Sequence, residues 1–408
     1  MNRRFTVLAR ARRHSRLLLD VATLSGWFAT HGRTSISDGS GLVGDFERAF
    51  ARMTESSFAL AMNSGTAALH SAYFAVGVGP GTEVIVPSYT WHASATPVLQ
   101  CGAIPVFCDI DPQTLTMDVD DMSRRITERT RAICVVHTWG NPAELDRILT
   151  VARAHGLAVV EDCSHAHGAR YGVKPVGSWG DVGCFSLHAS KPVAGGEGGV
   201  AVTDDPVLFD RMLLLGHVGR LGAGQAASTF QPDDVDLGVK YRPHLFAIHL
   251  ARSQLKRLPA ENARRARLWA LIRKELDGAS SLTPVQTLPM SERGGYYRFV
   301  VEHVGDRGAA GTDEVVRVAR SRGVPVTVEP YGRNLVHTSW VFSTLDRVQL
   351  GGGCFDATRP LEENMWTTPL PVCEDIGPRL IAFDQLTYLA SERFVARSAR
   401  ELCRAAGG

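Results

Sequence analysis

The sequence predicts an α/β protein with a mainly parallel central sheet flanked by helices and a smaller C-terminal α/β domain. Between about residues 43 and 240, short β-branched runs alternate with helical patterns, which is the signature of βαβ units. A long helical stretch at Leu245–Leu276 follows, and a second alternation of strand and helix patterns begins after it. A chain of 408 residues is long enough for two domains. We place them at 36–276 and 277–408, behind an N-terminal segment at 1–35.

The elements of the expected large domain follow one another along the chain. Its strand patterns are short, rich in β-branched residues and bounded by turn residues. The expected strands are Glu83–Val86, Ile104–Asp109, Ala132–His137, Leu157–Glu161 and Gly183–Leu187. The expected helices between them are Thr66–Ala75, Ala93–Cys101 and Ala143–His155.

The expected small domain repeats this alternation. Its elements are a strand at Tyr296–His303, a helix at Asp313–Arg322, a strand at Val324–Val328 and a helix at Asp375–Ala390. The polar stretch Gly219–Asp236 contains glycines and lacks periodicity, so we expect a mobile loop there. Loops of that length are often functional.

Composition excludes several classes of protein. The net charge of +2 is too close to neutral for a nucleic-acid-binding surface. No apolar run approaches the roughly 18 residues that a membrane span needs. The eight cysteines form no CxxC pair, which predicts neither a zinc site nor a disulfide framework. We expect reduced core cysteines in a cytoplasmic protein. The arginine-rich N-terminus lacks the serine enrichment of a transit peptide. We interpret it as the solvated basic face of a helix or as an irregular start of the chain.

Two residues indicate a specific cofactor chemistry. Lys191 precedes a glycine-rich turn at Gly195–Gly199, and Asp162 ends an apolar run 29 residues earlier. A lysine amine can hold the aldehyde of pyridoxal phosphate (PLP), and a carboxylate at a strand end can keep the ring nitrogen protonated. The alternatives are a surface lysine and a helix N-cap aspartate. Because the neighbours of Lys191 are apolar, small or glycine, we expect its amine to be partly desolvated and its pKa to be lowered.

Two further segments suit the same cofactor. In the strand-to-helix turn Asn63–Leu69, Gly65 permits close backbone approach, and the N–H groups of the first helical turn can hold a phosphate. An ordinary capped helix start is the alternative. Ser186 can add a hydroxyl to the same phosphate. Trp91 follows the strand pattern at Val84–Val86 and can stack on a flat heteroaromatic ring, with core packing as the alternative.

Taken in order, these segments resemble the DegT/DnrJ/EryC1/StrS family of sugar aminotransferases, most strongly over roughly residues 30–260. The signatures are Asn-Ser-Gly-Thr-Ala-Ala-Leu (63–69), Pro-Ser-Tyr-Thr-Trp (87–91), Gly-Ala-Ile-Pro-Val (102–106), Glu-Asp-Cys-Ser-His-Ala-His-Gly (161–168) and Phe-Ser (185–186) followed by Lys191 and Gly-Glu-Gly-Gly (196–199). The resemblance implies a fold-type I PLP enzyme that works as a homodimer with active sites at the subunit interface.

The resemblance also implies a role for each site residue. Lys191 would hold the cofactor aldehyde, and Asp162 would partner the pyridine nitrogen. The remaining contacts would be Gly65, Thr66 and Ser186 on the phosphate and Trp91 on the ring.

The chain departs from the family pattern at three places. His165 stands where the family commonly has glutamine near the cofactor's phenolic oxygen, and a histidine can still donate a hydrogen bond there, as in relatives that make aminohydroxybenzoate. Lys240, in Gly238-Val239-Lys240-Tyr241-Arg242, replaces an asparagine that reaches the partner's phosphate. Lysine can still meet a phosphate as a point charge. The segment 328–333 lacks the His-Tyr-Pro sequence of nucleotide-sugar members, which disfavours a nucleotide-sugar substrate.

The resulting hypothesis is an aminotransferase of secondary metabolism, such as antibiotic biosynthesis. It would move an amino group from L-glutamine or L-glutamate to a ketone or aldehyde of a sugar-like, cyclitol-like or related precursor. Two alternatives remain. One is a PLP-dependent dehydratase or a dual aminating and dehydrating synthase; pure dehydration is disfavoured because dehydratase members replace the lysine with histidine, whereas Lys191 is present. The other is a non-catalytic PLP-binding protein, which would not need Lys191, Asp162 and Ser186 together.

Overall fold

The computed structural model describes most of the chain. The described residues are 18, 20–27, 29–30, 35–220, 239–305, 308–339, 342 and 368–407. The arginine-rich segment before residue 18 lies outside this part, as does all of the expected loop Gly219–Asp236 except its first two residues. Among the residues described, no helix combines the length and the apolar character that crossing a bilayer requires.

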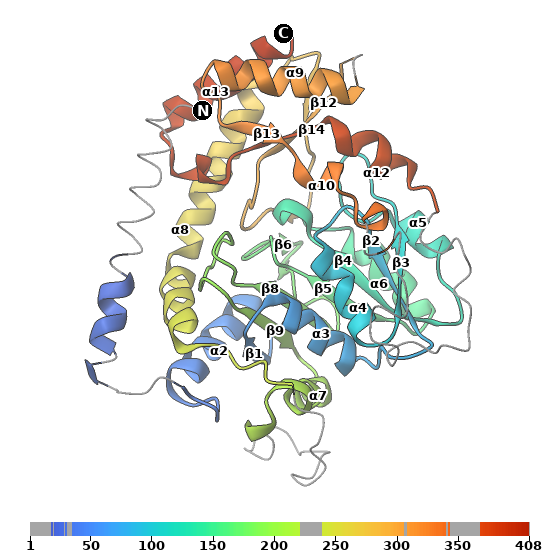
Figure 1. Cartoon of the computed structure of the whole chain (residues 1–408), viewed down its shortest axis with the longest axis vertical. Coiled ribbons are helices and arrows are strands. Elements are labelled where there is room, and N and C mark those ends of the chain that lie inside the picture. The colour runs from blue at the N-terminus through green and yellow to red at the C-terminus, as the bar shows by residue number, and fades with distance from the viewer. Residues whose placement is uncertain are drawn as a thin grey trace.

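A seven-stranded sheet, in the order β1-β9-β8-β5-β4-β2-β3, forms the centre of the lower body in Figure 1. Its strands are β1 (Phe58–Met62), β2 (Glu83–Pro87), β3 (Ile104–Cys108), β4 (Thr130–Val136), β5 (Ala158–Asp162), β8 (Val182–Ser186) and β9 (Gly199–Thr203). The pairings from β3 through β2, β4 and β5 to β8 are parallel, and β9 is antiparallel to both β8 and β1. The predicted mainly parallel sheet is therefore confirmed.

Helices cover both faces of this sheet. On one face lie α3 (Gly65–Ala75), α4 (Thr96–Gln100) and α7 (Pro206–Gly216). On the other face lie α2 (Gly41–Thr54), α5 (Val119–Arg124), α6 (Leu145–Ala154) and the first half of α8 (Leu245–Glu275). Consecutive strand residues face opposite layers: Val84 and Val86 pack on one side and Ile85 on the other. Burial of both faces explains why these strands read as continuous apolar runs.

The small sheet is antiparallel, in the order β10-β12-β14-β13. Its strands are β10 (Leu282–Pro284), β12 (Val300–His303), β13 (Val326–Val328) and β14 (Leu380–Phe383). Helices α9 (Gly308–Ser321) and α13 (Glu392–Ala405) and the end of α8 share its core. Figure 1 shows α8 running from the large sheet to this small sheet. The division of the chain at residue 276 into two domains stays a prediction.

The remaining short elements lie in connections. They are β6 (Arg170–Tyr171), β7 (Lys174–Pro175) and β11 (Ser291–Glu292), which form a three-stranded sheet, with α10 (Pro330–Arg333) and α12 (Pro371–Ile376). Here the structure corrects the prediction of a helix at Asp375–Ala390. The helix α12 ends at Ile376, and the segment continues as a short 3-10 helix (Gly377–Arg379), strand β14 and a second 3-10 helix (Gln385–Leu389). Pro378 lacks the N–H that a continuing helix needs, and the buried run Leu380–Phe383 pairs with β12 and β13.

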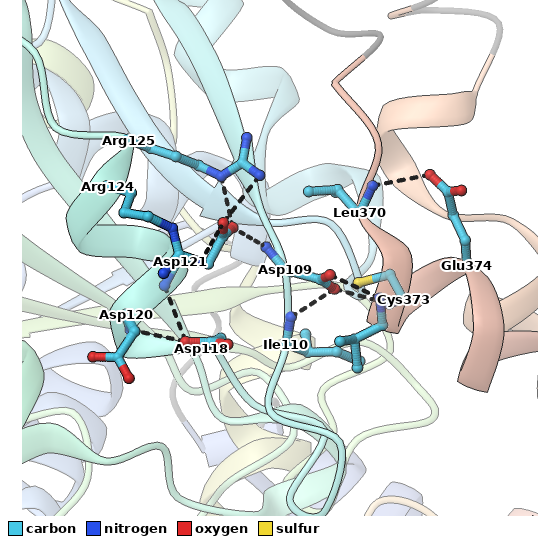
Figure 2. Close-up of polar contacts among 11 residues, drawn as sticks. Asp109, Ile110, Asp118, Asp120, Asp121, Arg124, Arg125, Leu370, Cys373 and Glu374 are labelled. Atoms are coloured by element: carbon cyan, nitrogen blue, oxygen red, sulfur yellow. Dashed lines mark hydrogen bonds and ion pairs between the residues drawn. The ribbon is translucent and has the colours of Figure 1, made fainter.

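One carboxylate connects the large sheet to α12. Asp109 follows β3 directly, and its two oxygens accept hydrogen bonds of 2.8 Å from the backbone N–H groups of Val372 and Cys373 in the first turn of α12 (Figure 2). Its own backbone N–H donates to Asp121, which also accepts from Arg125. A carboxylate at a helix N-terminus satisfies N–H groups that otherwise lack a partner. The end of β3 therefore helps to hold α12 in place.

Candidate active site

A cavity of about 420 Å³ lies at the carboxyl ends of the parallel strands, where ligands bind in open α/β sheets. Its walls combine the turns after β1, β2, β5 and β8 with two segments of the C-terminal region. The residues that line it are Ser64, Gly65, Thr66, Leu69, Thr90, Trp91, Ala93, Val136, Asp162, Ser164, His165, Ser186, His188, Ser190, Lys191, Glu197, Tyr297, Arg298, Pro330 and Tyr331. Every predicted site residue except Lys240 is among them.

Asp162 is the last residue of β5 and lies buried in the cavity wall. One of its oxygens accepts a hydrogen bond of 2.7 Å from the Ser94 hydroxyl, and the other accepts one of 3.0 Å from the backbone N–H of Ser164. No helix begins after Asp162 in this described stretch, so the helix-cap alternative does not apply. The two bonds fix the carboxylate at the strand end while one edge of it faces the cavity.

Lys191 follows β8 and reaches the same cavity. Its Nζ lies 4.2 Å from the centroid of the Tyr297 ring. Burial lowers the pKa of the Lys191 ammonium, while Tyr297 and Asp162 oppose that shift. This is the direction that the small and apolar neighbours of Lys191 predict. A lowered pKa increases the fraction of neutral amine, which is the nucleophilic form.

The first turn of α3 forms one end of the cavity. Ser64 caps the helix, because its hydroxyl accepts a hydrogen bond of 3.0 Å from the backbone N–H of Ala67. Ser186 packs so closely on this turn that a Cβ atom on Gly65 would lie 2.8 Å from the Ser186 Cβ. A helix N-terminus with adjacent hydroxyls is a suitable site for a phosphate dianion.

His165 is held in a stack of aromatic rings. Its imidazole is nearly parallel to the Tyr297 ring at 4.2 Å and to the Trp139 ring at 5.1 Å. Burial and then the charge of Lys191 hold the pKa of His165 well below its usual range. Its Nδ1 faces the backbone N–H of Trp139 at 3.4 Å, so the neutral ring carries its proton on Nε2. That N–H is a hydrogen-bond donor directed toward the cavity side, where the Tyr331 hydroxyl lies 3.5 Å away.

Beneath the cavity, Glu161 holds the end of β5 in place. Its carboxylate accepts hydrogen bonds from His137 Nε2 at 3.0 Å and from the backbone N–H groups of residues 177, 179 and 180. Burial acts to raise the pKa of Glu161, but these hydrogen bonds outweigh it and the pKa is lowered. His137, Glu161 and Cys163 have the spacing of a metal site. The four donors already occupy the Glu161 oxygens, so this cluster fits a structural role.

Among the residues of the cavity wall that the sequence analysis did not assign to the site are Tyr297, Arg298 and Tyr331. The first two were expected inside a strand, but β12 begins only at Val300. The preceding residue Tyr296 has a positive φ of 39°, which departs from strand geometry and lets the following side chains turn toward the cavity. The sequence signal for Tyr297 and Arg298 was that two aromatic residues and a basic residue stand next to one another at 296–298.

Lys240 and Trp91 lie differently from the other predicted residues. Lys240 is exposed and does not line the cavity of its own chain; its backbone carbonyl accepts a hydrogen bond from Asn63. Its contact with a partner's phosphate stays a prediction. Trp91 lines the cavity and is 52% exposed, so it is not a core residue. Its ring centroid lies 5.9 Å from that of Tyr331.

The comparison with known structures defines the class of protein. The structure of 3-amino-5-hydroxybenzoic acid synthase matches with a TM-score of 0.76 and 25% sequence identity, over 90% of this chain and 91% of that chain. The predicted fold-type I PLP transferase fold is thereby confirmed.

The family follows from the sequence comparisons. The DegT/DnrJ/EryC1/StrS aminotransferase family matches residues 23–358. L-glutamine:scyllo-inosose aminotransferase of Streptomyces griseus is 35% identical over 359 residues, which cover 86% of this chain and 77% of that protein. GDP-perosamine synthase of Escherichia coli O157:H7 is 35% identical over 378 residues, which cover 89% of this chain and 90% of that protein. The chain belongs to the DegT/DnrJ/EryC1/StrS aminotransferase family, a family of PLP-dependent enzymes, and the predicted class of enzyme is confirmed.

The residues of the cavity fit this cofactor. Ser186 and the first turn of α3 offer hydroxyl and N–H groups at one end, where Gly65 leaves room that a side chain would fill. At the other end, Lys191 offers a desolvated amine and Asp162 a fixed carboxylate. This set of donors and acceptors is complementary to a molecule that carries a phosphate, an aldehyde and a ring nitrogen.

Proposed function

We propose that this protein transfers the amino group of L-glutamine, with L-glutamate as a second donor, to a ketone or aldehyde of a cyclitol-like or sugar-like precursor in secondary metabolism. The names of the relatives support this substrate class, since they include an aminotransferase for an inosose and a synthase of an amino sugar. The observation that carries the proposal is the desolvated Lys191 amine in one cavity with Asp162 and the N-terminus of α3.

Lys191 has two functions in this proposal. Its amine would hold the aldehyde of PLP, and after an amino donor has displaced it, the neutral Nζ of Lys191 would accept the proton from the donor's α-carbon. The lowered pKa of Lys191 suits both functions, because a protonated amine can do neither. When bound, PLP supplies an electron-withdrawing ring that stabilises negative charge at that carbon.

The other residues position and tune the cofactor. Asp162 keeps the ring nitrogen protonated, and His165 donates its Nε2–H to the phenolic oxygen. Gly65, Thr66 and Ser186 hold the phosphate, while Trp91 covers the ring. The roles of these residues rest on their shared cavity and on their match to the family pattern.

A homodimer in the cytoplasm completes the proposal. In such a dimer Lys240 of one protomer would reach the phosphate in its partner's site, which agrees with its exposed side chain and with its absence from the lining of its own cavity. The dual aminating and dehydrating reaction is the second candidate, and the histidine at position 165 together with the structural match to 3-amino-5-hydroxybenzoic acid synthase favours it. A non-catalytic PLP-binding role is disfavoured because Lys191, Asp162 and Ser186 together line one cavity, a set that a binding protein would not need.

The test is a single half-reaction. PLP-loaded protein is mixed with L-glutamine or L-glutamate, and the absorbance spectrum follows conversion of the bound aldehyde form of the cofactor to its amine form. We expect conversion by the wild-type protein, none by Lys191→Ala, and wild-type behaviour by Lys256→Ala, which removes an exposed lysine on α8. Conversion that persists in Lys191→Ala would refute the role of Lys191. A bound cofactor that neither donor converts in the wild type would refute the aminotransferase.

A further inference from the structure

Arg298 is a cation in the cavity wall, and no carboxylate among the described residues forms an ion pair with it. It lines the cavity, and among the described residues its side chain forms neither a hydrogen bond nor an ion pair. Its Nε atom is buried and has no acceptor within the part of the chain that the structure describes. The guanidinium carbon lies 5.7 Å from the centroid of the Trp139 ring, which limits where the group can point. A buried N–H of a charged group without an acceptor is costly, and a carboxylate that pairs with the same guanidinium would offset part of that cost.

The buried carboxylates of nearby segments are committed elsewhere. Glu329 accepts hydrogen bonds from the Tyr89 hydroxyl at 2.8 Å and from the backbone N–H groups of Tyr331 at 3.0 Å and Gly332 at 2.8 Å. Asp162 accepts from a hydroxyl and a backbone N–H, as described above. Neither forms an ion pair with Arg298, although the charge of Arg298 acts to lower the pKa of Glu329. The guanidinium therefore stays available for a group that enters the cavity.

The position of Arg298 near Lys191 indicates which chemical group of a substrate would bind to Arg298. Tyr297, the preceding residue, lies with its ring 4.2 Å from Lys191 Nζ, and the positive charge of Arg298 acts to lower the pKa of Lys191. In an α-amino acid the amine and the carboxylate are attached to the same carbon. A donor whose amine reaches the place of the Lys191 amine consequently brings its carboxylate into the neighbourhood of Arg298. Arginine suits a carboxylate because its planar fork makes two parallel hydrogen bonds.

We propose that Arg298 binds the α-carboxylate of the amino donor. The proposal rests on the proposed function, since it assigns a residue to the donor in that same site. It also explains how one cavity serves two substrates: the donor is recognised by its charge, whereas an uncharged cyclitol acceptor uses the remaining polar groups. A carboxylate on the acceptor would bind Arg298 by the same chemistry. The donor half-reaction contains no acceptor, so an effect of Arg298→Gln on that half-reaction belongs to the donor.

The experiment compares two donors that differ only in the carboxylate. PLP-loaded wild-type protein, Arg298→Gln and a matched control, Arg317→Gln, are each mixed with L-glutamine and with 4-aminobutanamide, which is L-glutamine without its α-carboxylate. Arg317 lies on α9 with an exposed side chain and pairs only with Glu314 in the described structure. The rate of conversion of the cofactor is measured against donor concentration, and the spectrum of the bound cofactor before mixing reports whether the site is intact.

We expect Arg298→Gln to raise the KM for L-glutamine by about 10- to 150-fold, the range for loss of a charged hydrogen bond. The KM for 4-aminobutanamide should change less than about threefold, and Arg317→Gln should match the wild type. An unchanged KM for L-glutamine in Arg298→Gln would overturn the proposal and leave Arg298 for the acceptor. An equal loss for both donors would also overturn it, because that result indicates a structural role.

Two further measurements keep the test decisive. If Arg298→Gln does not fold, Arg298→Lys keeps the charge without the fork, and we expect a rise in KM for L-glutamine of roughly three- to tenfold. If the wild type converts neither donor, the proposed function has failed. Calorimetric binding of L-glutamine to the PLP-loaded wild type and Arg298→Gln then decides on Arg298 alone, and equal affinities would contradict its role.

Discussion

Replacement of Gly65 by alanine is the sharpest perturbation of the cavity. The added Cβ would lie 2.8 Å from Ser186 Cβ, 3.1 Å from Ser186 Cα and 3.3 Å from Ser186 Oγ. Carbon atoms in contact prefer about 3.5–4.0 Å, so either α3 or the end of β8 has to move. Neither can move freely, because α3 packs on the buried sheet and Ser186 is a residue of β8.

Overpacking of this kind costs about 1–3 kcal/mol. Because Gly65 and Ser186 both line the proposed phosphate site, we expect the displacement to weaken PLP binding by roughly 10- to 100-fold, as measured by absorbance titration of the cofactor-free protein. Urea unfolding of that protein should show a loss of stability of about 1–3 kcal/mol. The matched control is Gly79→Ala, since a Cβ at Gly79 meets nothing within 4 Å.

A second substitution tests the cause of the effect. Ser186→Gly removes the Cβ that the new methyl group would meet at 2.8 Å, so the double variant Gly65→Ala/Ser186→Gly should recover part of the stability lost in Gly65→Ala. If Gly65→Ala is as stable as Gly79→Ala and binds PLP equally well, the close approach of Gly65 and Ser186 is not what shapes this end of the cavity.

Two predictions concern stability away from the cavity. Asp109→Ala should destabilise the protein by about 1–3 kcal/mol in urea unfolding, because the first turn of α12 loses its acceptors, whereas the exposed Glu128→Ala should have little effect; equal midpoints for the two variants would refute the cap. Burial lowers the pKa of His217 to about 3, below the roughly 6.5 of an unfolded chain, so the unfolded state takes up the proton first as the pH falls. This histidine should therefore contribute a loss of about 1.4 kcal/mol per pH unit between about pH 6.5 and 3, and the slope of stability against pH should be shallower by that amount in His217→Gln. Parallel slopes would contradict the buried neutral state of His217.

The parallel part of the large sheet could be predicted from the sequence because its strands are buried on both faces. The run Glu83–Val86 is apolar after its first residue, and the residues of β2 alternate between two cores. Each run is short and is bounded by turn residues, which separates strands from helices of the same apolar character. The antiparallel strands β1 and β9 were not among the predicted strands, although turn residues bound both five-residue segments.

The part of the site that lies on one contiguous region of the chain was also predictable. Asp162 and Gly65 each adjoin a predicted strand or helix, and Lys191 lies in the loop that follows a predicted strand. The carboxyl ends of parallel strands meet at one edge of the sheet. Arg298 and Tyr331 come from segments beyond residue 277. Their approach to the cavity depends on how the small sheet packs against the large one. The periodicity of a short segment carries no information about that packing.

The wrong prediction of a helix at Asp375–Ala390 has the same cause, namely contacts between segments that are distant in the sequence. Leu380–Phe383 is a four-residue apolar run, and its strand character comes from β12 and β13, which pair with it from positions more than 50 residues earlier in the chain. A short apolar run is ambiguous between helix and strand until its partners are known.

The central claim is that the Lys191 amine holds PLP, and chemical trapping tests it most directly. PLP-loaded protein is treated with sodium borohydride, which makes the bond between the cofactor and its lysine irreversible, and the digested protein is analysed by mass spectrometry. The account predicts that the cofactor is found on the peptide that carries Lys191 and is absent from peptides that carry Lys174, Lys240 or Lys256. Cofactor on any of those lysines in place of Lys191, or on none of the peptides, would contradict it.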